Sequence, residues 1–217
     1  MTFAYYCGWR FFRSFYQLYF RAQWFNASRV PATGPVILAA NHASILDPPL
    51  VGVGLDRGIS YLARESLFRF PGVGSVLRSW DAVPVDRDGG GARGLKAIMD
   101  RLRAGGGIVL FPEGTRTLDG RLLPARSGIG LTVIKSTAPV VPVRLFGTFE
   151  AFGKNLRVPR PHKIVAKYGM PMAFAAQRAE AKSCSKARLK ELYQEIADEI
   201  MGQIEKLQPC GDCGEFP

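Results

Sequence analysis

The sequence predicts an α/β fold, in which a mostly parallel or mixed sheet is flanked by helices and preceded by an amphipathic N-terminal helix. The order of the predicted elements leads to this class. From residue 36 onward, short apolar runs alternate with segments in which apolar residues recur at helical spacing. Strands that alternate with helices are typical of sheets that carry helices on their faces. The length of 217 residues fits one such domain with a terminal extension.

Residues 1–27 predict an amphipathic helix that lies at a membrane interface. They hold half of the chain's aromatic residues, and arginines interrupt any run of about 20 apolar residues that could span a bilayer. When residues 9–24 are wound as a helix, Arg10, Arg13 and Arg21 share one stripe, which suits cations at lipid phosphates and rings among acyl chains. Packing of the same helix on the protein core is the alternative. The face opposite the arginines holds Phe11, Phe12, Phe15, Leu18, Tyr19 and Ala22.

Residues 28–208 are expected to form the main domain, which begins with a Pro- and Gly-containing linker. Residues 209–217 are rich in Gly and Pro. They predict a disordered tail, so the pair Cys210 and Cys213 is not interpreted as a redox or zinc site. We expect strands at 36–40, 59–63, 82–85, 108–111, 140–146 and 164–168, and helices at 91–104, 128–136 and 189–207.

Charge and cysteine content restrict the class of partner. Lys and Arg exceed Asp and Glu by 11, which favours an anionic partner. The cations are scattered and form no nucleic-acid-binding motif, so phosphorylated small molecules and anionic lipid are favoured over DNA or RNA. The four cysteines are unevenly spread, form a poor disulfide framework and indicate a reducing compartment. We expect no metal site and no bound cofactor.

Polar residues follow three of the predicted strands, at the end where α/β sheets bind their ligands. The first strand is followed by Asn41 and His42, the third by Arg87, and the fourth by the turn PEGTR. The three strand ends are therefore expected to line one crevice.

His42 and Asp47 have the chemistry of a general base and its orienting carboxylate. Near pH 7 an unperturbed imidazole accepts a proton, and a carboxylate on its other ring nitrogen fixes the tautomer and stabilises the imidazolium. A helix that starts near Ser44 would bring Asp47 within reach of the ring. The alternative makes Asp47 a helix cap and His42 a strand-end residue. Ser44 lacks the G-x-S-x-G elbow of hydrolase nucleophiles, which favours a capping role.

The segment FPEGTR, residues 111–116, predicts an anion-binding turn. Pro112 and Gly114 favour a tight turn whose backbone N–H groups point at an anion, and Arg116 offers a bidentate fork to phosphate. Arg87, within VPVDRD, is a second such fork. A surface ion pair is the alternative for each arginine, but their shared position after strands favours phosphate binding.

Four blocks resemble those of the glycerolipid acyltransferases, in particular the lysophosphatidic acid (1-acyl-glycerol-3-phosphate) acyltransferases. NHASILD resembles the NH-x4-D block, VPVDRD the second block, FPEGTR the third and APVVPV the fourth, in the same order over residues 35–150. The segment ARSG at 125–128 is similar to a family segment that usually carries lysine, where this chain has Arg126.

The resemblance implies the glycerolipid acyltransferase fold and gives roles to the site residues. His42 would take the proton from the free hydroxyl of a lysophosphatidate, and Asp47 would orient His42. The hydroxyl oxygen would attack an acyl thioester of acyl carrier protein or coenzyme A, without an acyl-enzyme, and give phosphatidic acid. The glycerol phosphate would be bound by Arg87, Glu113, Gly114, Thr115, Arg116 and Arg126.

The same resemblance implies a monotopic enzyme of phospholipid biosynthesis at the cytoplasmic face of the cell membrane. Deletion of residues 1–25 is expected to abolish vesicle binding. One alternative is a family acyltransferase with another acceptor: glycerol 3-phosphate, a lysophospholipid or an acylated amino-acid lipid. The other is a noncatalytic, membrane-bound lipid-binding protein, against which the intact NHASILD and FPEGTR motifs argue.

Overall fold

A computed structural model describes residues 3–80, 82–85 and 92–209 of the chain. Its main sheet has the strand order β1, β8, β7, β2, β6, β3, and a second, two-stranded sheet pairs β4 with β5. All neighbouring strands are parallel except β7 and β8. The strands are β1 (Gln23–Phe25), β2 (Val36–Ala40), β3 (Ile59–Ser60), β4 (Leu62–Arg64), β5 (Val83–Val85), β6 (Gly107–Leu110), β7 (Val140–Phe146) and β8 (Val165–Tyr168).

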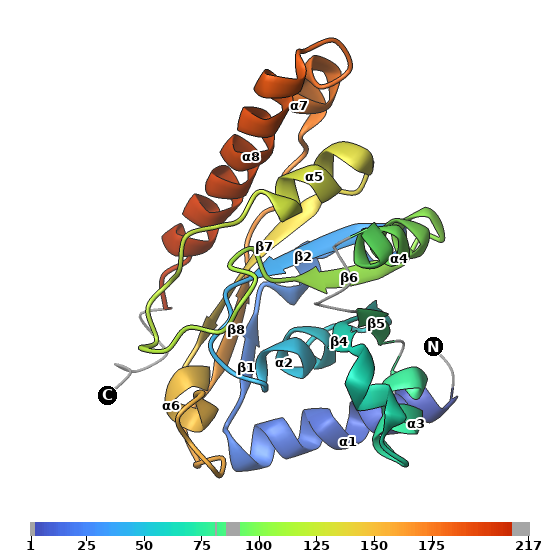
Figure 1. The fold of residues 1–217 in the computed structure, drawn as a ribbon. Coiled ribbons are helices and arrows are strands. Elements are labelled where there is room, and N and C mark those ends of the chain that lie inside the picture. The colour runs from blue at the N-terminus through green and yellow to red at the C-terminus, as the bar shows by residue number, and fades with distance from the viewer. Residues whose placement is uncertain (1–2, 81, 86–91, 210–217) are drawn as a thin grey trace.

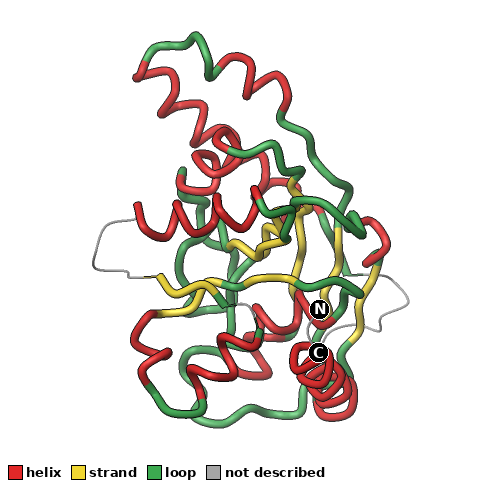
Figure 2. Tube along the Cα trace, turned by 90° about the vertical axis from the view of Figure 1, so that its right-hand side faces the viewer, coloured by secondary structure: helices red, strands yellow, loops and turns green. Residues whose placement is uncertain are grey.

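Helices cover both faces of the main sheet, and strands remain between helices when the molecule is turned by 90° (Figures 1 and 2). In Figure 1, α5 and α8 lie above the sheet, whereas α1 and α2 lie below it, with α2 between α1 and the strands. The helices are α1 (Phe3–Tyr19), α2 (Asp47–Val53), α3 (Val73–Ser79), α4 (Ala92–Arg103), α5 (Gly128–Lys135), α6 (Thr148–Phe152), α7 (Ala175–Glu180) and α8 (Lys186–Lys206), with short 3-10 helices at Ala27–Arg29 and Glu65–Arg69.

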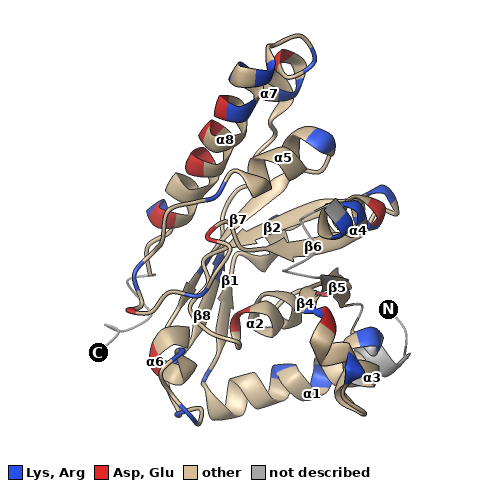
Figure 3. Ribbon diagram, viewed as in Figure 1, with Lys and Arg blue, Asp and Glu red and all other residues tan. Residues whose placement is uncertain are grey.

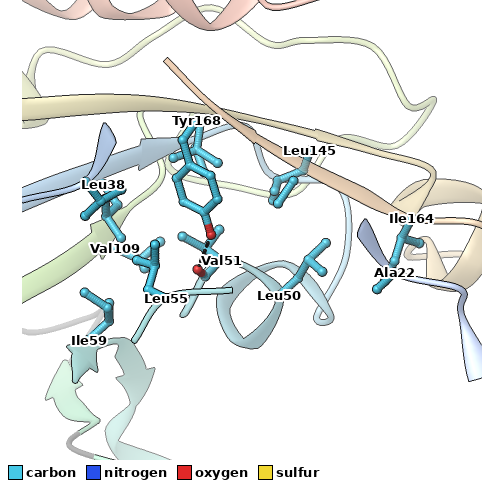
Figure 4. Packing of buried hydrophobic residues seen from close by; sticks show 14 of the residues in the cluster. Ala22, Leu38, Leu50, Val51, Leu55, Ile59, Val109, Leu145, Ile164 and Tyr168 are labelled. Carbon is cyan, nitrogen blue, oxygen red and sulfur yellow. Dashed lines mark hydrogen bonds between the residues drawn. The ribbon is translucent and has the colours of Figure 1, made fainter. Parts of the chain in front are cut away.

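Strand β2 divides the core into two layers, because alternate side chains of a strand point to opposite faces. All five of its residues are buried. Val36, Leu38 and Ala40 join the cluster that packs against α1 and α2, whereas Ile37 and Ala39 join the cluster that packs against α4, α5 and α8. Figure 4 shows part of the first layer, in which the Tyr168 hydroxyl donates to the carbonyl of Val51 in α2. The predicted α/β fold with flanking helices is confirmed.

The N-terminal helix is present, but it is shorter than predicted. It ends at Tyr19, Arg21 adopts a left-handed backbone conformation with φ of 53°, and Gln23–Phe25 pair with β8 as the edge strand β1. Tyr16 and Phe20 are fully buried in the core. Helical periodicity alone cannot show that the aromatic residues after Tyr19 pair better in a sheet, so the predicted boundary at residue 27 is wrong.

The remaining elements lie close to their predicted positions. The strands at 36–40 and 140–146 match β2 and β7 residue for residue, and the helix at 128–136 corresponds to α5. The strand predicted at 59–63 is divided into β3 and β4, which belong to different sheets. None of the helices among the described residues is both long and apolar enough to cross a bilayer. The tail predicted beyond Pro209 lies outside the described residues.

Charge is unevenly distributed over these elements. Figure 3 shows Lys and Arg on α1 and α3, on the side of the molecule that also carries α2, and on α4, whereas acidic residues gather along α8. Arg188 of α8 bonds to Glu180 and Glu195 on the exposed surface. The basic excess of the chain is therefore concentrated away from α8.

Candidate active site

His42 and Asp47 form a hydrogen-bonded pair at the carboxyl end of β2. The Nδ1 atom of His42 lies 2.9 Å from Oδ2 of Asp47, and the side chain of His42 is 15% exposed whereas that of Asp47 is fully buried. A carboxylate can only accept at this contact, so Nδ1 carries the proton and Nε2 keeps a free lone pair. The pair therefore has the arrangement of a general base and its orienting carboxylate.

Asp47 is held in place by the start of α2 and by the loop that precedes it. Its Oδ2 atom accepts the backbone N–H groups of Ala43 and Ser44, at 2.6 Å each, as well as the ring of His42. Asp47 is the first residue of α2, where the helix dipole favours a negative charge. The five-residue spacing between His42 and Asp47 thus follows from one tight loop between β2 and α2.

Ser44 fastens the loop before α2 and does not cap that helix as predicted, because the N-cap residue of α2 is Leu46 and no side chain caps it. The hydroxyl of Ser44 donates to the carbonyl of Phe152 at 2.6 Å and accepts the N–H of Leu46 at 3.1 Å, and the residue is fully buried. Both bonds fasten the loop around His42, to α6 on one side and to α2 on the other. A hydroxyl held in this way is not placed as a nucleophile.

Glu113 supports the histidine loop from behind. Its carboxylate accepts the backbone N–H of His42 at 2.9 Å and that of Leu123 at 3.3 Å, and the residue is only 2% exposed. The carbonyl of His42 in turn accepts the N–H of Thr117 at 2.9 Å. Glu113 therefore fixes the main chain of the base, and the prediction that Glu113 binds substrate is replaced by this role, because the carboxylate is enclosed.

The turn after β6 is a tight one, as predicted from FPEGTR. Gly114 has a φ of 68°, a left-handed conformation that favours glycine, and its N–H donates to the carbonyl of Phe111. The ring of Phe111 stacks on the ring of His42 with centroids 3.9 Å apart. The turn thus confines the imidazole on one face while Asp47 holds its edge.

Replacing Glu113 by glutamine is expected to change how stability depends on pH. Burial raises the pKa of the Glu113 carboxyl from 4.5 to about 7, although the N–H groups of His42 and Leu123 act against this shift. Because the folded protein holds this proton more tightly than the unfolded chain, the wild type loses stability as the pH rises from about 4.5 to about 7. Glutamine does not titrate. Urea unfolding between these pH values should show that the unfolding free energy of the wild type falls relative to that of E113Q as the pH rises. If the difference between the two free energies stays constant or increases, the raised pKa of Glu113 is contradicted.

His42 lines a cavity of about 530 Å³ that combines an apolar wall with cationic side chains. The apolar wall is suited to an acyl chain and the cations to a phosphate group. The cations are Arg64 at the end of β4, Arg116 in the turn after β6 and Lys154 after α6. The apolar wall includes Ile45, Leu62, Leu67, Leu77, Trp80 and Ala82.

The structure brings together some of the predicted site residues and separates others. Thr115 and Arg116 line the cavity with His42, whereas Gly114 and Arg126 do not, and Arg126 is exposed beside Gly114. Arg87 lies outside the described residues. Arg64 and Lys154 were missed by the sequence analysis, because neither belongs to a block with a recognisable spacing.

Side chains from α1, β1 and β8 hold α2 by donating to the carbonyl oxygens of α2 and of its flanking residues. A helix of seven residues leaves its last carbonyls without intrahelical donors, and these groups must be satisfied from outside. Tyr16 of α1 also lies near Asp47, and burial together with the Asp47 carboxylate raises the pKa of its phenol, so Tyr16 stays a donor. The donors and acceptors are Trp9 to Leu55, Arg13 to Val53, Tyr16 to Leu46, Trp24 to Leu50 and Tyr168 to Val51, over 2.6–3.0 Å.

The other face of α1 is exposed and apolar. Phe11, Phe15, Leu18 and Tyr19 line a shallow depression on it, and Arg10 is exposed nearby. Arg13, expected on a lipid-facing stripe, instead lies over the rings of Trp9 and Trp24 against the protein. One face of α1 therefore packs on the core, as the alternative interpretation expected, and the other face is exposed; its contact with a membrane stays a prediction.

The family of the chain follows from comparison with known proteins. The family model described as Acyltransferase matches residues 22–145, which include β2, the His42–Asp47 pair and the turn after β6. The chain belongs to the acyltransferase family.

None of the described residues forms a group of three or more His, Cys, Asp or Glu that could hold a metal ion.

Curated members of the acyltransferase family resemble the chain over its central part. A 1-acyl-sn-glycerol-3-phosphate acyltransferase of Bacillus subtilis is 32% identical over 133 residues, which cover 61% of this chain and 65% of the relative. The human enzyme named 1-acyl-sn-glycerol-3-phosphate acyltransferase beta is 31% identical over 159 residues, or 67% of this chain and 53% of the relative. In both cases the chain spans less than two thirds of the relative's length.

A solved structure in the acyltransferase family has the same fold. The 1-acyl-sn-glycerophosphate (LPA) acyltransferase PlsC from Thermotoga maritima superposes with a TM-score of 0.65, over 94% of this chain and 84% of that chain. The sequence identity of 22% limits this likeness to the fold. The structural likeness extends beyond the region that the family model matches. Because 94% of the chain is aligned, the aligned part must include most of α1 and of α8.

Proposed function

We propose that the chain transfers an acyl group from a thioester to the free hydroxyl of 1-acyl-glycerol 3-phosphate, giving phosphatidic acid. The observation that carries this proposal is the oriented pair His42 and Asp47 at a cavity that has both an apolar wall and three cations. The names of the curated relatives support the same acceptor.

The base step uses the free Nε2 atom of His42. The acceptor hydroxyl gives its proton to Nε2 as its oxygen bonds to the thioester carbonyl carbon, and Asp47 stabilises the imidazolium that forms. The C–S bond then breaks, and the imidazolium returns the proton to the departing thiolate. No acyl-enzyme is needed, which agrees with the two hydrogen bonds that occupy the hydroxyl of Ser44.

The acceptor phosphate is bound by the cations of the cavity. Arg64, Arg116 and Lys154 come from three separate parts of the chain and line the same space as His42. Charge-assisted bonds from guanidinium groups to phosphate oxygens orient the glycerol backbone toward the base. An acyl chain lies along the apolar wall formed by residues such as Leu62, Leu77 and Trp80.

The enzyme acts from one leaflet of a membrane, at its cytoplasmic face. Phe11, Phe15 and Leu18 project from the free face of α1, where aromatic and aliphatic side chains can enter the acyl region of a leaflet. The basic side chains near α1 and α3 favour anionic lipid. The donor is a thioester of acyl carrier protein or coenzyme A, with no further cofactor.

A panel of acceptors and donors tests the proposal. The purified chain on vesicles is given one labelled acyl thioester, of acyl carrier protein or of coenzyme A, with lysophosphatidate, glycerol 3-phosphate or a lysophospholipid with a larger head group. Transfer to lysophosphatidate is expected to exceed transfer to the others. Preference for another acceptor, or no transfer to any, contradicts the proposal and favours a different family activity or a noncatalytic lipid-binding protein.

Replacing Arg116 by leucine is expected to raise the KM for lysophosphatidate at least tenfold. A hydrogen bond to a charged partner contributes about 1.5–3 kcal/mol, which corresponds to roughly 10- to 150-fold in binding. Arg157 is the matched control, because it is exposed and does not line the cavity. Equal KM values for R116L and R157L contradict the phosphate-binding role of Arg116.

A further inference from the structure

A second cavity, of about 200 Å³, borders the residues on either side of His42. Asn41 and Ala43 line it, together with the end of β7, the start of α6 and His162. It shares no lining residue with the 530 Å³ cavity. This space, called the Arg144 cavity below, has no part in the reaction proposed above.

Arg144 brings a buried positive charge to this cavity without a matching carboxylate. Its Nε and Nη1 atoms are buried and have no hydrogen-bond partner among the described residues. Glu205 and Glu113 attract the guanidinium from a distance, but the oxygens of Glu113 are already occupied by the N–H groups of His42 and Leu123. A guanidinium does not lose its proton in proteins, so the charge persists.

Two further side chains at the cavity offer hydrogen bonds. Thr148 is only 1% exposed, and its hydroxyl has no partner among the described residues. His162, the second histidine of the chain, lines the same cavity and approaches Gly147, whose φ is 75°. Glu150 is the acidic residue of the lining, and it is exposed at the rim.

The cost of these unpaired groups indicates what the cavity accepts. An unpaired buried hydroxyl destabilises the fold and an unpaired buried charge does so more strongly, so native proteins pair such groups with a ligand or a counter-ion. The face of the guanidinium is covered by Phe146, whose ring centroid lies 5.4 Å from Cζ, which leaves the edge of the group for hydrogen bonding. The volume suits a small polar group and is too small for an acyl chain.

We propose that the Arg144 cavity binds a phosphate group, held by the guanidinium of Arg144, the hydroxyl of Thr148 and the ring of His162. A tetrahedral oxyanion presents several acceptor oxygens, and these match donors that converge from β7, α6 and the segment before β8. The site is separate from the cations that hold the acceptor phosphate in the proposed reaction. It adjoins the catalytic loop through Asn41, whose amide bonds in both directions to the backbone of Leu145.

Phosphate binding to the purified full chain tests this site. Inorganic phosphate is titrated by calorimetry at constant ionic strength, and glycerol 3-phosphate serves as a second probe that distinguishes a phosphomonoester from the free ion. The wild type is expected to bind at least one probe, R144L to lose that binding, and T148V to bind about tenfold more weakly. Because the Thr148 hydroxyl has no partner among the described residues, valine at this position should leave the fold intact.

Two control variants locate the bound phosphate. R157L removes an exposed arginine away from both cavities and is expected to bind as the wild type does. R116L removes a cation of the substrate cavity and should also keep the Arg144-dependent binding. Binding that is lost in R116L but kept in R144L places the ion in the substrate cavity and overturns the proposal. If R144L fails to fold, the affinity of T148V for phosphate decides, and an affinity equal to that of the wild type overturns the proposal. The proposal is also overturned if the wild type binds neither probe.

Discussion

Replacing His42 by alanine is expected to lower acyl transfer by about two to four orders of magnitude or more, the usual range for removal of a general base. The fold should survive, because the bonds that fix this part of the loop come from the main chain. The N–H of residue 42 donates to Glu113 and its carbonyl accepts from Thr117, whichever side chain it carries. Turnover on vesicles measures the loss, and circular dichroism and vesicle binding should be unchanged.

Asp47 supplies the internal control for this prediction. Asn at position 47 keeps the size of the side chain but removes the charge that stabilises the imidazolium, so D47N should also be slow. Since the two residues act as a unit, the double variant should be no slower than H42A alone. Normal turnover by H42A refutes the assignment of the base, and losses that multiply contradict the coupling between His42 and Asp47.

Replacing Phe11, Phe15 and Leu18 together by serine is expected to weaken vesicle binding by about a thousandfold. These side chains are 66%, 37% and 83% exposed on the free face of α1. Insertion of each into a leaflet contributes on the order of 1–2 kcal/mol, and a total of about 4 kcal/mol corresponds to three orders of magnitude. Flotation with vesicles that contain anionic lipid measures the change, and the melting temperature should stay close to that of the wild type.

A matched triple variant separates membrane contact from general hydrophobicity. Leu118, Val158 and Met170 are comparably exposed, at 59%, 68% and 66%, and lie outside α1. Their replacement by serine should leave vesicle binding unchanged. Equal losses in the two triple variants, or no loss in the first, contradict the role of α1 at the membrane.

The sequence predicted those parts of the fold and site that depend on nearby residues. The contact between His42 and Asp47 was expected from their spacing together with a helix that starts near Ser44, and a single loop and the first residue of α2 do bring them together. Strands β2 and β7 were located because each is a mostly apolar run with most of its residues buried. In these cases local pattern and tertiary packing favour the same structure.

Features that depend on distant residues could not be predicted in this way. Arg64 and Lys154 meet Arg116 only after separate segments fold around one cavity. The end of α1 at Tyr19 depends on pairing between β1 and β8, which lie about 140 residues apart in the chain. The inward direction of the Glu113 side chain likewise depends on the backbone of His42 and Leu123. Local periodicity carries no information about such partners.

The bonds from residues 9–24 to the carbonyls of α2 and its flanking residues have a practical consequence for producing the protein in water. Tyr16 and Phe20 are core residues, and removal of residues 1–25 would also take away the side-chain donors to the carbonyls of Leu46, Leu50, Val53 and Leu55. Loss of vesicle binding by that truncated chain would therefore report unfolding as well as loss of lipid contact. A variant with a less apolar surface is therefore better made by substituting exposed residues of α1 such as Phe11 and Leu18, with the first helix retained.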